Sequence, residues 1–315
     1  MINIFTPLQH ELAAGRCVAL GIVTATWGSA PRSVGSMMLV REDGSFEGSV
    51  SGGCVEGSVI AEAQMLLRNK GTSRRLEFAV SNDDAFAVGL ACGGTIRVSL
   101  FALTPSAASD ITRALQANTE RQSGELEISY ATGVATFSGR PRDTLEDSDD
   151  ALFLPLKPRL RLDIIGAVHI AQMLAPMAAR CDFDVTVIDP RASFTEGRSF
   201  DGAKVVGDWP DEYLRDHPVD AHTALVTLTH DPKLDDAALR PALGGDTLYI
   251  GCLGSRKTHA ARLNRLREAG FDEKALGRIH GPVGLDIGAA NPAEIAVSIL
   301  AEIIAVMRKG AADAV

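Results

Sequence analysis

The sequence predicts an α/β protein with two domains, of which the first mixes helices and strands and the second contains a parallel sheet. From residue 161 onward, strand-like apolar runs alternate with amphipathic segments, which is typical of repeated βα units. Before residue 104, strand-like runs, tight turns and helical spacing are mixed. The chain has 315 residues, and single cores usually stop growing at about 250–300 residues, so we expect two cores.

Composition narrows the functional classes. Hydrophobic residues make up 46% of the chain and charged residues 23%, which is ordinary for a globular protein. The net charge of -9 argues against a nucleic-acid binder, which needs a basic face. The N-terminal residues do not resemble a secretory signal, and the apolar runs stay shorter than about 18 residues. We therefore expect a cytoplasmic protein without a membrane span.

The five cysteines are irregularly spaced and form no CxxC pair, so the sequence predicts free thiols rather than a disulfide framework or a structural zinc site. Cys17 and Cys181 are expected to be small buried side chains. Cys252 is left open because it lies close to the turn "GSRK". Cys54 and Cys92 lie in glycine-rich loops and are considered below.

The first domain is predicted over residues 1–105, with two helices and four strands. In chain order, the expected elements are a helix at 5–15, strands at 16–28 and 37–43, a helix at 58–71, and strands at 74–80 and 95–103. Gly44 should close a turn after the second strand. Residues 106–157 are predicted as an extension and linker, with a helix at 105–122, a hairpin at 125–139 and a polar connector at 140–160.

The second domain, residues 158–315, begins with strand, glycine turn, helix and strand, and this alternation predicts a doubly wound parallel sheet. It ends in a helix whose start is clearly marked, because Asn291 can cap it, Pro292 suits its first position and Glu294 has capping-box spacing. The apolar stripe of this helix is wide enough for burial against the sheet or a partner, and it consists of Ile295, Ile299, Ile303 and Met307.

The glycine turn "GAVHIA" makes this domain Rossmann-like. A dinucleotide fingerprint requires GxGxxG/A, and Gly166 fits its first position, but Val168 replaces the second glycine. Asp189, at the end of the next strand, has the spacing of a ribose-binding acid. His169 belongs to the same turn. NAD(P) binding is weakened by Val168, and a nucleotide fold without a functional nicotinamide cofactor is the preferred interpretation.

Two further loops follow predicted strands. In "LGSRKTH", Ser255 is placed to cap a helix, and Arg256 and Lys257 oppose its dipole, which favours either a bound anion or two solvated side chains. In "THDPKLDD", His230 and Asp231 lie at the ligand-binding edge of a parallel sheet, but turn chemistry explains this pair equally well. For this second loop, the turn is the preferred interpretation.

The loop "VSGGCVEGSV" places Cys54 just ahead of a helix start, where the helix dipole favours a thiolate. Gly52 and Gly53 permit unusual backbone angles and can expose amide donors to a ligand. The alternative is a small buried cysteine. The glycine pair favours a functional thiol site.

The loop "LACGGTI" has the reverse order, with Cys92 followed by Gly93 and Gly94, and receives the same interpretation. A third loop, "GSAPRSVG", offers Arg32 as a planar donor to phosphate or carboxylate, with a structural ion pair as the alternative.

With these motifs assembled, the chain closely resembles the xanthine dehydrogenase accessory factor family (XdhC/CoxI). The matching segments are "GSAPRSVGSMMLV", "GSVSGGCVEGSV", "GLACGGTIRV", "THDPKLDDAAL", "YIGCLGSRKTHAARLNRLREAG" and "GPVGLDIGAANPAEIAVSILAEIIA". They span both domains and leave only the region around 104–156 without a marker. The glycine turn of the family usually reads GAGH, so Val168 is a departure.

The resemblance implies a maturation chaperone rather than an enzyme. Members of the family bind molybdenum cofactor (molybdopterin), assist its sulfuration together with a cysteine desulfurase, and deliver it to a molybdenum hydroxylase of the xanthine or CO dehydrogenase type. Cys54 and Cys92 would then face the cofactor as thiol ligands to its molybdenum or during sulfuration. The glycine and basic loops would bind its anionic parts, and the chain could form a homodimer.

Two other functional classes stay open. An NAD(P)-dependent oxidoreductase would use the C-terminal domain, but the sequence offers no evident proton-transfer pair for it. A cofactor-free scaffold would leave the paired cysteine loops unexplained.

Overall fold

The structure, a computed structural model, confirms the predicted fold class and divides into two compact units, Met1–Pro158 and Arg159–Val315. The residues that it describes are 4–28, 32–53, 55–80 and 94–309. Within this part of the chain, no helix is both long and apolar enough to cross a membrane.

Unit 1 is built around a five-stranded sheet in which all neighbouring strands are antiparallel, with the order β3-β2-β1-β5-β4. Its strands are β1 (Val18–Gly28), β2 (Met37–Val40), β3 (Phe46–Gly48), β4 (Ser73–Val80) and β5 (Gly94–Leu103). The turn predicted at Gly44 joins β2 to β3, with a φ of 89° that a glycine adopts without strain.

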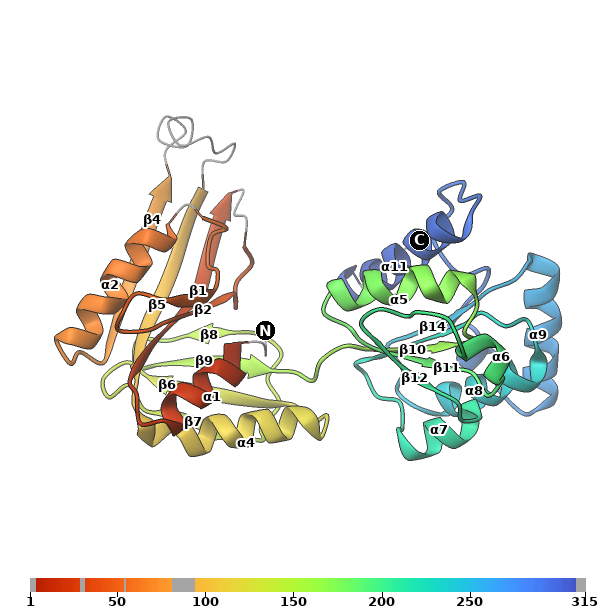
Figure 1. The fold of residues 1–315 in the computed structure, drawn as a ribbon, viewed down its shortest axis with the longest axis horizontal. Coiled ribbons are helices and arrows are strands. Elements are labelled where there is room, and N and C mark those ends of the chain that lie inside the picture. The colour runs from red at the N-terminus through yellow and green to blue at the C-terminus, as the bar shows by residue number, and fades with distance from the viewer. Residues whose placement is uncertain (1–3, 29–31, 54, 81–93, 310–315) are drawn as a thin grey trace. The chain divides into compact units, whose positions relative to one another are not determined.

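The two faces of this sheet are covered differently (Figure 1). Helix α2 (Glu56–Arg68) packs on one face through Val59, Ala63 and Leu66. The other face packs against two α-helices, a short 3-10 helix and a second sheet of order β7-β6-β9-β8. These elements are α1 (Phe5–Ala13), η2 (Pro105–Ala107), α4 (Ala108–Thr119), β6 (Gly124–Ser129), β7 (Ala135–Ser138), β8 (Glu146–Asp147) and β9 (Ala151–Leu156).

The connector predicted at residues 140–160 is wrong in part, because β8 and β9 lie within it. β9 pairs with β6 along its whole length and is mostly buried. The acidic run ahead of it and Pro155 obscured this strand in the sequence. β8 pairs only with Leu152 and Phe153, so β9 has one open side at Pro155, where a missing N–H is tolerated.

Unit 2 contains a six-stranded parallel sheet of order β12-β11-β10-β13-β14-β15. The strands are β10 (Arg161–Ile165), β11 (Asp184–Ile188), β12 (Ala203–Val206), β13 (Thr223–Thr227), β14 (Tyr249–Cys252) and β15 (Ile279–His280). Renumbered within the unit, this is the 3-2-1-4-5-6 order of dinucleotide-binding folds, with its reversal between β10 and β13.

Helices cover both faces of this sheet (Figure 1). On one face lie α5 (His169–Arg180) and α11 (Pro292–Lys309), and on the other α7 (Pro210–Asp216), α8 (Pro232–Gly244), α9 (Arg256–Glu268) and α10 (Glu273–Leu276), while α6 (Ala192–Thr195) is a single short turn. The predicted cap of the last helix is confirmed, since the Asn291 side chain accepts from the amides of Ala293 and Glu294, each at 3.0 Å.

Candidate functional site

One end of the first sheet holds the attachment points of two predicted site segments. Gly28 at the end of β1 and Val80 at the end of β4 both have strand partners at the first residue of β5, Gly94. In the sequence, residues 29–31 follow Gly28, and residues 81–93 come between Val80 and Gly94. The antiparallel register therefore places Gly28, Gly94 and Val80 side by side at one end of the sheet.

Several predicted site residues are not part of the described structure. Cys54, Cys92 and Gly93 lie outside the described residues, so their roles stay predictions. Arg32 is exposed in the turn that leads into β2. This turn folds back on β1, because the amide of Gly35 donates to the carbonyl of Val23 at 2.8 Å.

Glu56, the first residue of α2, is the centre of the loop that precedes it. Its buried carboxylate accepts a hydrogen bond from the hydroxyl of Ser51. Its other donors are the hydroxyl of Ser49 at 2.7 Å and the amides of Val50 at 3.2 Å, Ser51 at 2.9 Å, Gly52 at 2.9 Å and Gly53 at 2.8 Å. Consecutive amides that converge on one anion form a backbone nest.

The two glycines make this nest possible. Gly52 has a φ of 84° and Gly53 a φ of 126°, both in the region that other residues avoid. The sequence pattern predicted that their amides serve a ligand, and in the structure they are bonded to Glu56. Their observed role is to fold the loop around that carboxylate.

The hydrogen bonds keep Glu56 ionised. Burial of the carboxylate raises its pKa, but the hydrogen bonds from Ser51, Ser49 and the loop amides outweigh burial and lower the pKa to about 2. A fixed negative charge therefore lies at the start of α2. It offsets the positive end of the helix dipole, which is the field expected to activate a thiol in this loop.

The three described cysteines differ from one another in exposure. Cys17 and Cys181 are exposed, so the expectation that they are buried is wrong. Cys252 is buried at the end of β14, and burial raises its pKa to about 11. The neutral thiol is therefore the stable form of Cys252, which removes it as a candidate nucleophile.

In unit 2, the glycine turn after β10 meets the loop after β13. Gly166 has a φ of 109°, and a Cβ atom at this position would lie 2.6 Å from Cγ2 of Thr229. Only glycine fits here without displacing the neighbouring loop. His169 begins α5 and is exposed.

Asp189 is engaged within the protein rather than presented to a ligand. It is fully buried, and its carboxylate accepts from the Ala167 amide at 2.8 Å and from Nε and Nη2 of Arg191 at 2.8 and 2.7 Å. Burial opposes ionisation, but the Arg191 hydrogen bonds hold the pKa of this carboxyl below its ordinary value. Both the acid expected for a ribose and one amide of the glycine turn are therefore already bonded.

The start of α9 has a different character. Ser255 caps the helix as predicted, accepting from the Thr258 amide at 3.1 Å. Arg256 and Lys257 are exposed in the first turn. A neutral cap with two adjacent cations is suited to an anionic ligand.

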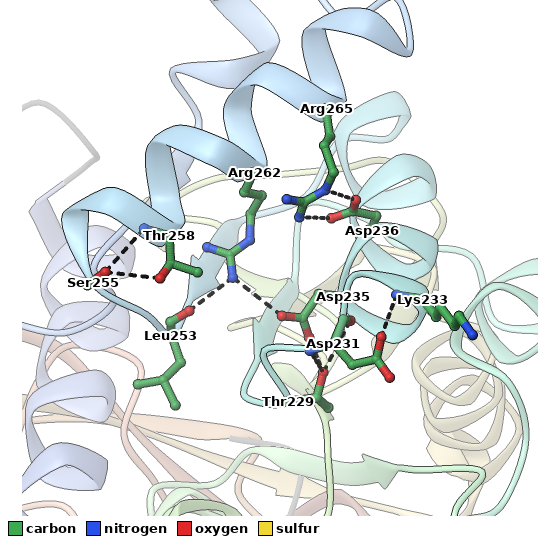
Figure 2. A network of polar contacts seen from close by, with 10 residues as sticks. All are labelled: Thr229, Asp231, Lys233, Asp235, Asp236, Leu253, Ser255, Thr258, Arg262 and Arg265. Atoms are coloured by element: carbon green, nitrogen blue, oxygen red, sulfur yellow. Dashed lines mark hydrogen bonds and ion pairs between the residues drawn. The ribbon is translucent and has the colours of Figure 1, made fainter.

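A buried polar relay fixes this loop to its neighbour (Figure 2). Arg262 is 1% exposed, and its Nη2 atom donates to the Leu253 carbonyl at 2.9 Å and to Asp235 at 3.3 Å. The Thr229 hydroxyl donates to the other oxygen of Asp235 at 2.7 Å. Burial raises the pKa of Asp235 despite these partners. The relay joins the loop after β13 to the loop after β14.

The HDP segment has the turn chemistry that the sequence favoured. Asp231 caps α8 and accepts from the Lys233 amide at 2.9 Å (Figure 2). His230 is exposed next to it and has a φ of 62°. Sequence reasoning missed the Glu56 nest and the Asp235–Arg262 pair. The glutamate was visible within "SGGCVEG", whereas the two residues of the pair are far apart in the sequence.

The fold and these loops define a two-domain α/β protein whose second domain is a Rossmann domain. Residues 11–79 match the XdhC and CoxI family, and residues 162–303 match the XdhC Rossmann domain. The chain belongs to the XdhC/CoxI family.

Similar proteins include the molybdenum cofactor insertion chaperone PaoD of Escherichia coli strain K12, with 28% identity over 298 residues that cover 94% of this chain and 86% of PaoD. A relative from Bacillus subtilis strain 168, named as a probable subunit of xanthine dehydrogenase, is 28% identical over 337 residues, covering 96% of this chain and 97% of the relative. The crystal structure of a xanthine dehydrogenase from Bacillus halodurans has a TM-score of 0.76, 25% identity and 96% coverage of each chain.

Proposed function

We propose that this protein is an accessory chaperone that binds molybdenum cofactor, assists its sulfuration and inserts it into a molybdenum hydroxylase such as xanthine or CO dehydrogenase. The observation that carries the proposal is the similarity to a molybdenum cofactor insertion chaperone along most of both chains. The match to the XdhC and CoxI family in the first unit and to the XdhC Rossmann domain in the second supports it.

The phosphate of the cofactor would bind in unit 2 at the start of α9. Ser255, Arg256 and Lys257 supply a helix start and two exposed cations there. Of the glycine-turn residues, His169 is exposed and would face the same edge of the sheet. Gly166 and Asp189 would act indirectly, since one permits the close approach of Thr229 and the other fixes the turn.

Unit 1 supplies the candidate thiol ligands. Molybdenum with sulfur ligands suits soft thiolates, so Cys54 and Cys92 are the candidate contacts. Gly52 and Gly53 would present Cys54 through the loop that Glu56 folds, and Gly93 and Gly94 would do the same for Cys92. Arg32, exposed on a neighbouring turn, would bind an oxyanion of the cofactor.

The test compares cofactor content among cysteine variants after anaerobic purification. Molybdopterin is oxidised to its fluorescent derivative and quantified per chain for the wild type, Cys54→Ala, Cys92→Ala and the double variant. Cys17→Ala and Cys181→Ala are matched controls because both thiols are exposed. We expect the double variant to lose most of the cofactor and the controls to keep it. Equal cofactor content in all variants would disprove the thiol role.

The partners are tested in cells that produce a molybdenum hydroxylase. We expect the hydroxylase and a cysteine desulfurase to co-purify with the chain under anaerobic conditions, and hydroxylase activity to depend on the chain. A chain that carries no cofactor and leaves hydroxylase activity unchanged when deleted would favour the cofactor-free scaffold. Sedimentation of the purified chain tests the homodimer.

A further inference from the structure

His230 has an unusual backbone conformation for its place in the fold. Four described residues other than glycine have a positive φ. Lys70, Arg121 and Asp182 come shortly after the ends of α2, α4 and α5, where a left-handed residue ordinarily terminates a helix. His230 instead lies between β13 and α8, at the carboxyl edge of the parallel sheet, so no helix end accounts for it.

The residues on both sides of His230 hold it in this conformation. The Thr229 hydroxyl accepts from the Asp231 amide at 3.0 Å and donates to the buried Asp235 (Figure 2). Asp231 in turn caps α8 through the Lys233 amide. Since both neighbours are tied to the rigid relay, the strain at His230 cannot relax locally.

The imidazole of His230 lies against the start of the α9 loop. A Cβ atom at Gly254 would be 3.7 Å from its Nδ1 atom, and Gly254 has a φ of 139°. Gly254 directly precedes Ser255, so the exposed imidazole lies beside the loop that carries Arg256 and Lys257.

We propose that His230 contacts an oxyanion of the ligand bound at the start of α9, with an imidazole N–H donating to that oxygen. A glycine would adopt this backbone conformation without strain. A histidine here costs stability, and a contribution of its side chain to binding accounts for that cost. The inference rests on the proposed function only in naming the phosphate of molybdenum cofactor as the ligand.

The experiment uses His230→Gly in the full chain. Relief of backbone strain should affect the thermal midpoint, whereas loss of the imidazole should affect the affinity for an anion. We expect the thermal midpoint to stay level or rise by up to about 3 °C. Binding of inorganic pyrophosphate, measured by titration calorimetry, should weaken about tenfold. Asp182→Gly is the matched control in the same unit, with a φ of 68°, and should leave pyrophosphate affinity unchanged.

Pyrophosphate affinity of His230→Gly within twofold of the wild type would overturn the inference, as would a wild-type chain that does not bind the probe at all. Cofactor content keeps this result separate from the proposed function. If the wild type carries molybdopterin and His230→Gly retains it and the probe equally well, the chaperone role stands and His230 has no ligand contact. If the wild type carries none but binds pyrophosphate through His230, the oxyanion contact stands and the chaperone role fails.

Discussion

The loops that lead into α2 and α9 are held in place by different interactions. In unit 1, the loop closes around an internal anion, because the amides from Val50 to Gly53 all donate to Glu56. In unit 2, Arg262 holds the loop from behind through the Leu253 carbonyl, and the neutral Ser255 hydroxyl caps the helix. Among the described residues, no carboxylate is bonded to the first-turn amides of α9.

Because of this difference, the two loops are suited to different ligands. A loop whose amides already hold a carboxylate has few amides left for a phosphate. Cys54 lies outside the described residues and stays the proposed functional group of this loop. A loop held from behind keeps its helix start and its cations for an external anion. This difference favours the start of α9 as the proposed anion site, and thiol chemistry stays the proposed role of the loop before α2.

The largest effect is expected for Arg262→Gln. The substitution removes the cation from a buried pair, and we expect a loss of about 3 kcal/mol in the stability of unit 2 and weaker pyrophosphate binding. Urea unfolding followed by Trp209 fluorescence in a Trp27→Phe background reports on unit 2, since the chain has 2 tryptophans. Arg265→Gln removes a more exposed pair with Asp236 at the same helix interface and should cost less than about 1 kcal/mol.

The Arg262 result bears directly on how the α9 loop is held. If Arg262→Gln and Arg265→Gln had equal effects on stability and on pyrophosphate affinity, the relay would have no special role in positioning the loop. A double variant, Arg262→Met with Asp235→Leu, should recover much of the lost stability because neither charge is then left unpaired.

Glu56→Ala should destabilise unit 1 by about 2–3 kcal/mol, because it leaves converging amides and two serine hydroxyls without their acceptor. Unfolding followed by Trp27 fluorescence in a Trp209→Phe background measures this effect. Glu77→Ala is the control, because its carboxylate forms an exposed ion pair with Arg97 and should contribute less than about 0.5 kcal/mol. Equal losses in the two variants would contradict the nest as the main constraint on the loop.

The pH dependence of the stability of unit 1 is an independent test of the Glu56 nest, with a smaller expected effect. The pKa of Glu56 falls from 4.5 in the unfolded chain to about 2 in the folded protein. Its contribution to stability is therefore complete above pH 4.5 and is lost as the pH falls toward 2. Glu56→Gln should flatten this part of the unfolding profile. An unchanged acid profile in the variant would mean that other carboxylates dominate.

Much of the fold could be predicted because its signals are local. The βα alternation predicted the parallel sheet, and Asn291 and Glu294 marked the start of α11. β9 was missed because Pro155 and the acidic residues before it resemble a connector. Its place is set by pairing with β6, a distant segment whose partner the sequence does not specify.

The candidate site was predicted less completely, because the role of each residue depends on the hydrogen-bond partners that it meets in the folded chain. The glycines of "SGGCVEG" were predicted to serve a ligand, but amides that can serve a ligand and amides that hold Glu56 have the same sequence pattern. Asp189 had the expected ribose-binding spacing, whereas its burial and its pairing with Arg191 are properties of the packed fold. Spacing indicates which residues meet, and burial decides which of them remain available.

The weakest binding is expected for nicotinamide nucleotides. Asp189 is the group that would bond a ribose, and its two oxygens already accept from Ala167 and Arg191. Val168 replaces the glycine that lets a pyrophosphate approach α5. We therefore expect fluorescence titration with NADH or NADPH to show no saturable binding below about 1 mM, a weak limit for a cofactor. Restoring glycine in Val168→Gly should not create tight binding while Asp189 stays paired. Micromolar binding by either chain would show that the Asp189–Arg191 pair opens for a ligand and would revive the oxidoreductase alternative.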